Sequence, residues 1–209
     1  MGLLVLTVAV GQTTRLTAYE KAQGWRLLFD GFSRAGWHGY KSNKMPVNWR
    51  IEGEALVCAE EPGPVVVSDE TFRDFELSFQ WKIAAGGRAE IFFRLSEDGA
   101  TPGETGPVFQ LGGEDLECGG NGGLIKPWRE TKVAPETWHQ AKLTVYGNQV
   151  EHWINGSQIA SYLLDGAEWR AAVAASRFAA ARDYGRLPEG AIALAGRGAS
   201  FRSIKARSL

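Results

Sequence analysis

Three polar side chains in otherwise apolar stretches of this chain could take part in chemistry. Glu90 and Arg94 lie in the polar row of a strand-forming stretch, and Gln110 lies inside the apolar run 107–111. A guanidinium in a cleft binds an anion or stabilises an oxyanion, whereas on a solvated face Arg94 would form a structural ion pair with Glu90. A buried amide must be hydrogen-bonded, so Gln110 either ties down a loop or binds a ligand hydroxyl. These alternatives stay open from the sequence.

A long glycine-rich loop, residues 112–123, carries three further acids, Glu114, Asp115 and Glu117. Loops of this length inside a compact domain are often functional. The three carboxylates are therefore either ligand-binding groups or solvated loop residues.

The histidines and cysteines do not form a recognisable metal or redox motif. His38, His139 and His152 are scattered, and we expect each to be a packed or surface residue. Cys58 and Cys118 are far apart, with no CxxC pattern and no histidines at zinc spacing, so two buried thiols are expected and one disulfide is the alternative. We assign no metal ligands.

The elements that must position these residues are strands. Residues 75–83 alternate strictly between apolar and polar side chains, which predicts a half-buried strand. Gly86 and Gly87 follow, and because glycine tolerates positive φ they favour a reversal of the chain. A second strand through Leu95 would then place Glu90 and Arg94 on one face.

The rest of the chain is also rich in strand signals. Strands are expected at residues 25–29, 49–51, 55–58, 65–68, 107–111, 141–146, 150–154, 158–162, 191–195 and 201–206. Capping-box patterns begin two short helices, at Thr17 and at Asp165. No βαβ repeat is present, so we predict an all-β fold, a two-sheet antiparallel jelly-roll sandwich with two peripheral helices.

The bulk composition is that of an ordinary globular protein. With 209 residues, 22% charged residues and a net charge of -1, nothing indicates binding to nucleic acid or to an anionic membrane. The eight tryptophans suit both core packing and stacking on sugar rings. Residues 1–16 are expected to be a residual export signal or an N-terminal extension, and 17–209 one sandwich domain. The apolar run 2–10 favours a periplasmic or secreted protein and is too short for membrane insertion.

Several short motifs follow one another along the chain in a specific order. They are GWRLLFDG at 24–31, DFEL at 74–77, IFFR at 91–94, ETGP at 104–107, VEHWING at 150–156, the helix at 169–178, YGR at 184–186 and GAIAL at 190–194. In this order they resemble the 3-keto-disaccharide hydrolase domain family, which has a concanavalin-A-like (lectin/glucanase) sandwich. The resemblance covers the chain from about Glu20 to its end.

The resemblance implies carbohydrate chemistry on a sugar or glycoside. In a 3-keto sugar the C2 proton is acidic because it lies next to a carbonyl. A base removes it, the enediolate is stabilised by a cation or hydrogen-bond donors, and the C1 substituent leaves. Such a site needs a general base and an oxyanion stabiliser, and a divalent metal is possible.

The chain departs from the family pattern at the positions that would carry this chemistry. Where the family commonly reads Asn-Ser-Gly, residues 88–90 read Arg-Ala-Glu. Where it reads Gly-Pro-Glu-x-Gln-x-x-Asp, residues 106–113 keep Gln110 and lose both acids. Where it reads Gly-His-Ile-Ala-Leu-Gln-Asp-His-Gly, residues 190–198 lose both histidines and the Asp. The expected metal ligands are therefore absent.

Two hypotheses follow. In the first, the chain is an enzyme with a rewired site: Glu90, Glu114, Asp115 or Glu117 supplies the base, Arg94 or Arg197 the charge stabiliser, and Gln110 contacts the substrate. In the second, the chain is a carbohydrate-binding or scaffold sandwich without catalysis. A protein-interaction sandwich is a third, plainer alternative.

Overall fold

The computed structural model describes residues 14–59, 64–113, 118–129 and 131–209. The elements are α1 (Ala18–Ala22), β1 (Arg26–Leu27), β2 (Trp37–Gly39), β3 (Trp49–Glu52), β4 (Ala55–Cys58), β5 (Val66–Phe72), β6 (Phe75–Leu95), η1 (Pro102–Glu104), β7 (Val108–Gly113), β8 (His139–Tyr146), β9 (Gln149–Ile154), β10 (Ser157–Leu163), α2 (Ala167–Ala174) and β11 (Gly190–Ser208). Most of the predicted strands and both helices are confirmed.

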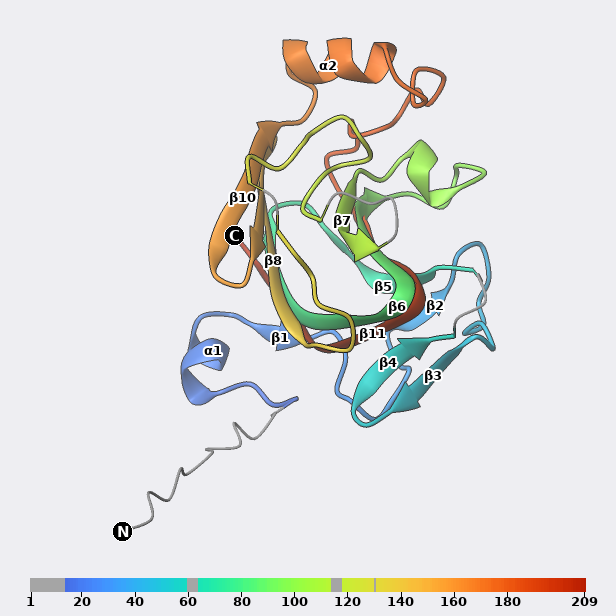
Figure 1. Cartoon of the computed structure of the whole chain (residues 1–209), viewed down its shortest axis with the longest axis vertical. Coiled ribbons are helices and arrows are strands. Elements are labelled where there is room, and N and C mark those ends of the chain that lie inside the picture. Colours follow the sequence, from blue (N-terminus) through green and yellow to red (C-terminus); the bar gives the residue numbers. More distant parts are fainter. Residues whose placement is uncertain (1–13, 60–63, 114–117, 130) are drawn as a thin grey trace.

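The fold is an open antiparallel β-sandwich organised around β6 and β11. The strands pair in the order β10-β9-β8-β6-β11-β4-β3, with β7 added to β6, and β5 and β1 to β11. Figure 1 shows β6 and β11 running side by side through the bend at the base of the molecule. The predicted all-β sandwich with two short helices is therefore confirmed.

The predicted reversal at residues 84–87 is wrong, because β6 is one continuous strand. Ile83 pairs with Ala199, and Arg88 pairs with Arg197. Between these two pairs β6 advances by five residues and β11 by only two. Gly86, with φ of 72°, allows this bulge. The glycines bend the strand instead of turning it back. Two strands were also expected within 190–208, and they form the single strand β11.

The two halves of β6 share one core. Phe75 and Phe79 before the bulge, and Ile91 and Phe93 after it, belong to one buried cluster and are fully inaccessible to solvent. Burial of one such side chain stabilises the fold by about 1.5–3 kcal/mol. Because side chains alternate along a strand, Glu90 and Phe92 lie on the opposite face, outside this core.

The two cysteines are both free thiols inside the core, and the alternative of a disulfide is wrong. Burial raises the pKa of Cys58 to about 11 and that of Cys118 to about 12. Both thiols therefore remain protonated and inert near neutral pH.

The two helices differ in how they begin. Thr17 and Glu20 form the predicted capping box of α1. At α2, however, Gly166 is the N-cap and Asp165 is not. Asp165 has φ of 51°, outside the extended region that an N-cap uses, and its carboxylate accepts a hydrogen bond from Arg170.

Within the described residues, neither helix is long and apolar enough to cross a membrane. The prediction for the N-terminal segment concerns residues 1–16, of which 1–13 lie outside the described residues.

Candidate functional site

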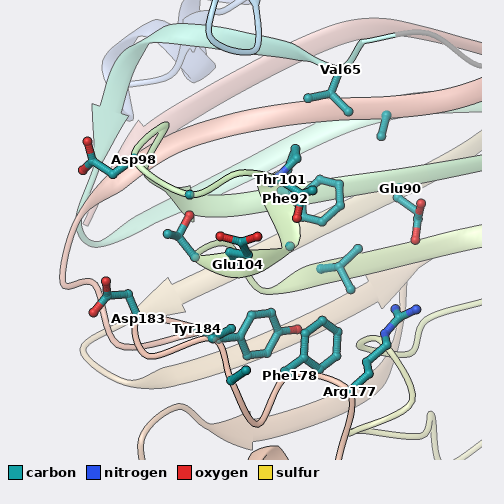
Figure 2. Close-up of a pocket in the computed structure, with 18 of the residues that line it drawn as sticks. Val65, Glu90, Phe92, Asp98, Thr101, Glu104, Arg177, Phe178, Asp183 and Tyr184 are labelled. Carbon is teal, nitrogen blue, oxygen red and sulfur yellow. The ribbon is translucent and has the colours of Figure 1, made fainter.

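A cavity of about 1330 Å³ opens on the face of the second half of β6 that lies away from the core. Its wall comes from β6, β7 and β11, and two segments cover its sides: residues 98–105 around η1 and residues 177–184 after α2. Figure 2 shows labelled side chains of β6 and of both covering segments facing one space. The charged lining residues are Arg88, Glu90, Asp98, Glu104, Arg177, Arg182, Asp183 and Arg197.

The aromatic part of the lining is Phe92, Phe178 and Tyr184. The rings of Phe178 and Tyr184 stack with centroids 4.1 Å apart, and Tyr184 in turn stacks on Trp169 of α2 at 5.7 Å. This stack fixes the covering segment against the sandwich. It also presents apolar surface of the kind on which the C–H face of a sugar ring packs.

A buried polar network holds Tyr184 from below. The Tyr184 hydroxyl donates to Asn121 Oδ1 at 2.9 Å, and Asn121 Nδ2 donates to the Tyr162 hydroxyl at 2.7 Å. That hydroxyl lies 3.1 Å from His152 Nε2, and His152 Nδ1 lies 2.8 Å from Gly119 O. Burial lowers the pKa of His152 to about 4, so the ring is neutral, donates through Nδ1 and accepts through Nε2. His152 is thus a packed histidine, as expected.

Glu90 and Arg88 form an ion pair at the cavity wall. Arg88 Nη2 lies 2.5 Å from Glu90 Oε2, and the Glu90 side chain is only 8% exposed. Arg197 stands opposite Arg88 in the β6–β11 ladder, and its Nη2 donates to Gly86 O at 2.6 Å. Glu90 and Arg197, two of the predicted site residues, are therefore brought to one cavity.

Gln110 stands directly opposite Glu90 in the β6–β7 ladder, on the same face of the sheet. Its main chain accepts from Gly119 N at 2.7 Å and donates to Gly120 O at 3.0 Å. The backbone of Gln110 thus ties the following loop to β7. The side chain adjoins Glu90 but is not part of the cavity lining.

Arg94 lies away from the cavity, and it does not form the ion pair with Glu90 that was one alternative. Between Phe92 and Leu95, β6 has one residue more than the facing stretch of β11, and Arg94 has φ of 46°. This bulge breaks the alternation on which the prediction rested. The Arg94 guanidinium is buried and donates to Arg73 O and Gly147 O, while Asp74 lies 3.3 Å away.

The buried Arg94 therefore joins two turns of the sandwich. Desolvation lowers the pKa of Arg94, but the guanidinium remains charged because arginine loses its proton only far above neutral pH. Its contacts are those of a structural residue, and we leave it out of the proposed site.

The remaining predicted acids, Glu114, Asp115 and Glu117, lie outside the described residues. The metal that the family resemblance allows does not fit the residues that are described. Among them no three His, Cys, Asp or Glu side chains come close enough to hold an ion. In the cavity, Val108, Gly196 and Arg197 occupy the positions where the family pattern has Glu, Asp and His. We derive no step through a metal.

Sequence reasoning missed the two covering segments. Arg177, Phe178 and Asp183 come from an alanine-rich stretch, and Asp98 and Glu104 from a polar loop. Neither stretch has a periodic pattern that would place its side chains. The available signal was the family resemblance, because its motifs at 104–107, 169–178 and 184–186 contain the cavity residues Glu104, Phe178 and Tyr184.

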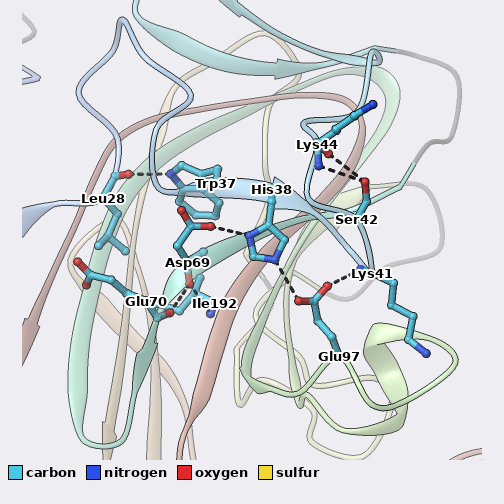
Figure 3. A network of polar contacts seen from close by, with 11 residues as sticks. Leu28, Trp37, His38, Lys41, Ser42, Lys44, Asp69, Glu70, Glu97 and Ile192 are labelled. Carbon is cyan, nitrogen blue, oxygen red and sulfur yellow. Dashed lines mark hydrogen bonds and ion pairs between the residues drawn. The ribbon is translucent and has the colours of Figure 1, made fainter.

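A second polar cluster anchors the loop that covers one side of the cavity (Figure 3). His38 Nδ1 lies 2.6 Å from Asp69 Oδ1, and His38 Nε2 lies 3.0 Å from Glu97 Oε2. The Tyr40 hydroxyl donates to Gly99 O at 2.8 Å. Because both ring nitrogens face carboxylates, the cationic ring satisfies both contacts. Burial opposes the charge, but the hydrogen bonds to Glu97 and Asp69 outweigh it and raise the pKa of His38.

Comparisons with known proteins agree with the fold and with the sugar-related chemistry. The chain is 27% identical to a 3-keto-disaccharide hydrolase of Bacteroides thetaiotaomicron over 82% of this chain and 72% of that protein. A crystal structure from Parabacteroides distasonis, named as a candidate glycosyl hydrolase, has 26% identity and a TM-score of 0.86, covering 95% of this chain and all of that one.

A more distant structure, carbohydrate-binding module CBM66 of Bacillus subtilis, shares the fold alone. It has 13% identity and a TM-score of 0.53, and the match covers 83% of this chain and 96% of the module. Residues 24–207 match the sequence model of one protein family, the 3-keto-alpha-glucoside-1,2-lyase-like domain. The chain therefore belongs to the 3-keto-alpha-glucoside-1,2-lyase-like domain family, whose members are carbohydrate-active domains of the glycosyl hydrolase kind.

Proposed function

We propose that the chain binds a 3-keto-glycoside in this cavity and cleaves its glycosidic C–O bond by removing the proton on C2. One observation carries the proposal: six of the nine positions at which the chain departs from its family pattern line the cavity. Arg88, Glu90, Val108, Ala195, Gly196 and Arg197 all line it. Substitutions scattered by drift would not be expected to surround one space.

Glu90 is placed to act as the general base. Arg88 holds Oε2 of its carboxylate, whereas Oε1 has no hydrogen-bond partner among the described residues. An oriented carboxylate with one open oxygen beside an apolar wall can accept the C2 proton of a bound ketone. Removal of the proton places the C2–H electron pair in a C2–C3 double bond and the negative charge on the C3 oxygen, where Arg197 supplies donors and positive charge. When the C3 carbonyl re-forms, this pair moves into a C1–C2 double bond, the C1–O bond breaks, and the leaving oxygen takes the proton that Glu90 removed.

The second candidate is a carbohydrate-binding sandwich without catalysis. The observation that favours it is the loss of proton-transfer groups at the cavity, because Val108 and Gly196 stand where the family pattern has acids and cannot move a proton. Both candidates place the sugar in the same space. They differ in whether Glu90 acts on it.

Hydrolysis assays with a chromogenic substrate separate the two. The protein is incubated with 4-nitrophenyl 3-keto-glucoside, and release of nitrophenol is followed. The proposal expects turnover that falls at least about 100-fold in Glu90→Gln, since general-base catalysis typically contributes that much. Glu52→Gln is the control, because Glu52 lies in the β3–β4 hairpin and does not line the cavity.

Two results would decide against catalysis by Glu90. Unchanged turnover in Glu90→Gln removes it as the base. No turnover, together with saturable sugar binding in calorimetry, establishes the binding domain instead.

A further inference from the structure

The charges of the cavity are separated into two ends. Figure 2 shows Glu90 and Arg177 at one end, Asp98 and Asp183 at the opposite end, and the rings of Phe92, Phe178 and Tyr184 between them.

The first of these ends, here called the arginine end, comprises Arg88, Arg177, Arg197 and Glu90. Arg88 is 2.5 Å from Glu90, and Arg197 stands opposite Arg88 in the ladder. Three guanidinium groups and one carboxylate give this end a formal charge of +2. The charged lining residues outside the arginine end are Asp98, Glu104, Arg182 and Asp183, and their formal charge is -2.

The positive charge of the arginine end is not neutralised by the described protein. Among the described residues, Arg88 alone has a carboxylate partner at this end, and Arg197 donates to a main-chain oxygen. Arg177 is exposed, lies with its guanidinium 4.8 Å from the centroid of the Phe178 ring, and has no ion pair among the described residues. The ring contact orients the guanidinium over the aromatic wall while leaving its N–H donors for a ligand.

The acids Asp98 and Glu104 accept hydrogen bonds from within the covering loop. Asp98 Oδ2 accepts from Ser96 Oγ at 2.6 Å, and Glu104 Oε2 accepts from Ala100 N at 2.8 Å. These carboxylates shape the covering loop, and their remaining lone pairs can accept hydroxyl groups. A ligand that is neutral at one end and negative at the other therefore matches the cavity.

We propose that the glycoside bound here carries an oxyanion substituent, a carboxylate, sulfate or phosphate, that pairs with Arg177 at the arginine end. The inference rests on the proposed function, because it assumes that a sugar occupies the cavity. A guanidinium presents parallel N–H donors that match two oxygens of such a group. Arg88 and Arg197 add to the local positive potential, while Arg197 keeps its role near the ketone.

Calorimetry with three anionic sugars and one neutral sugar tests the inference. The probes are methyl glucoside, methyl glucuronide, glucose 6-sulfate and glucose 6-phosphate. At least one anionic probe is expected to bind about tenfold more tightly than methyl glucoside, as a charge-assisted hydrogen bond allows, and the gain should shrink at high salt. The probe that binds most tightly identifies the kind of oxyanion.

Substitutions at Arg177 locate the contact. Arg177→Gln is expected to remove the roughly tenfold preference without changing the affinity for methyl glucoside, and Arg177→Lys to keep part of it. Arg182→Gln removes the same charge from the same segment, but next to Asp183, and it should leave the preference intact.

The possible results distinguish a failure of this inference from a failure of the proposed function. Equal binding of neutral and anionic sugars overturns the inference and leaves the glycoside site standing. A preference that survives in Arg177→Gln but is lost in Arg182→Gln also overturns it. If none of the sugars binds, the proposed glycoside site itself fails.

Discussion

Arg88 Nη2 lies 2.5 Å from Glu90 Oε2, two residues along the same strand and on the same face of β6. The arginine is half exposed and the glutamate nearly buried. The pair therefore brings a carboxylate to the wall of the cavity without leaving it uncompensated. It also lies at the place where the family pattern has Asn-Ser-Gly, so the pair is a feature of this chain's own sequence.

Removal of Arg88 should destabilise the fold more than removal of both partners. Arg88→Ala leaves a buried carboxylate without its cation and is expected to cost about 1 kcal/mol, a value reduced for the exposure of the arginine. Arg88→Ala combined with Glu90→Gln should recover part of this. Urea unfolding of the single and double variants measures both. Strictly additive losses would show that the two side chains do not interact.

The buried network below Tyr184 should depend on the Tyr162 hydroxyl. Tyr162→Phe leaves His152 Nε2 without a donor and Asn121 Nδ2 without an acceptor, and it should cost about 1–3 kcal/mol in the free energy of unfolding. Tyr146→Phe is the matched control, since Tyr146 is 65% exposed. Equal stability of the two variants would mean that the network contributes nothing.

Arg94 should act in stability and not in ligand binding. Arg94→Lys keeps the charge but cannot reach Arg73 O and Gly147 O together as the forked guanidinium does. We expect a loss of about 1–3 kcal/mol in thermal or urea unfolding, with sugar affinity unchanged at a temperature where the variant is folded. A large loss of sugar affinity in a fully folded Arg94→Lys protein would show that Arg94 belongs to the ligand-binding site.

The cluster of His38, Asp69 and Glu97 should make the covering loop sensitive to pH. The pKa of His38 is raised in the folded protein above its ordinary value of 6.5. Its contribution to stability is therefore complete below about pH 6.5 and is lost as pH rises through the folded-state pKa. Because the groups are partly exposed, we expect about 0.5–1 kcal/mol.

Hydrogen exchange of residues 97–101 at several pH values measures this loss locally. Exchange, corrected for its intrinsic pH dependence, should accelerate above the folded-state pKa, and His38→Gln should remove the step. A step that persists in His38→Gln would assign the titration to another group.

Much of the fold could be predicted because its signals are local. The alternation in residues 75–83 and the Asn155-Gly156 turn of the β9–β10 hairpin depend only on neighbouring residues. The continuity of β6 could not be predicted, because Gly86 permits a bulge as readily as a turn and the pairing with β11 decides between them. That choice depends on residues more than 100 positions away in the chain.

The candidate site was predictable only in part. Glu90 and Arg197 were found because charges replace the family pattern there, and both line the cavity. Arg94 was misplaced because a single residue at φ of 46° reverses the alternation. Arg177 and Tyr184 were not proposed, since their place at the cavity follows from ring stacking between distant elements and from no pattern in sequence.

A crystal structure of the protein with a bound 3-keto-glycoside would show whether Glu90 reaches a sugar in this cavity. We expect the sugar ring in the cavity beside Phe92 and Phe178, with C2 within reach of Glu90 Oε1 and the C3 oxygen facing Arg197. A sugar bound elsewhere on the sandwich, with this cavity filled only by solvent at saturating ligand, would contradict this expectation.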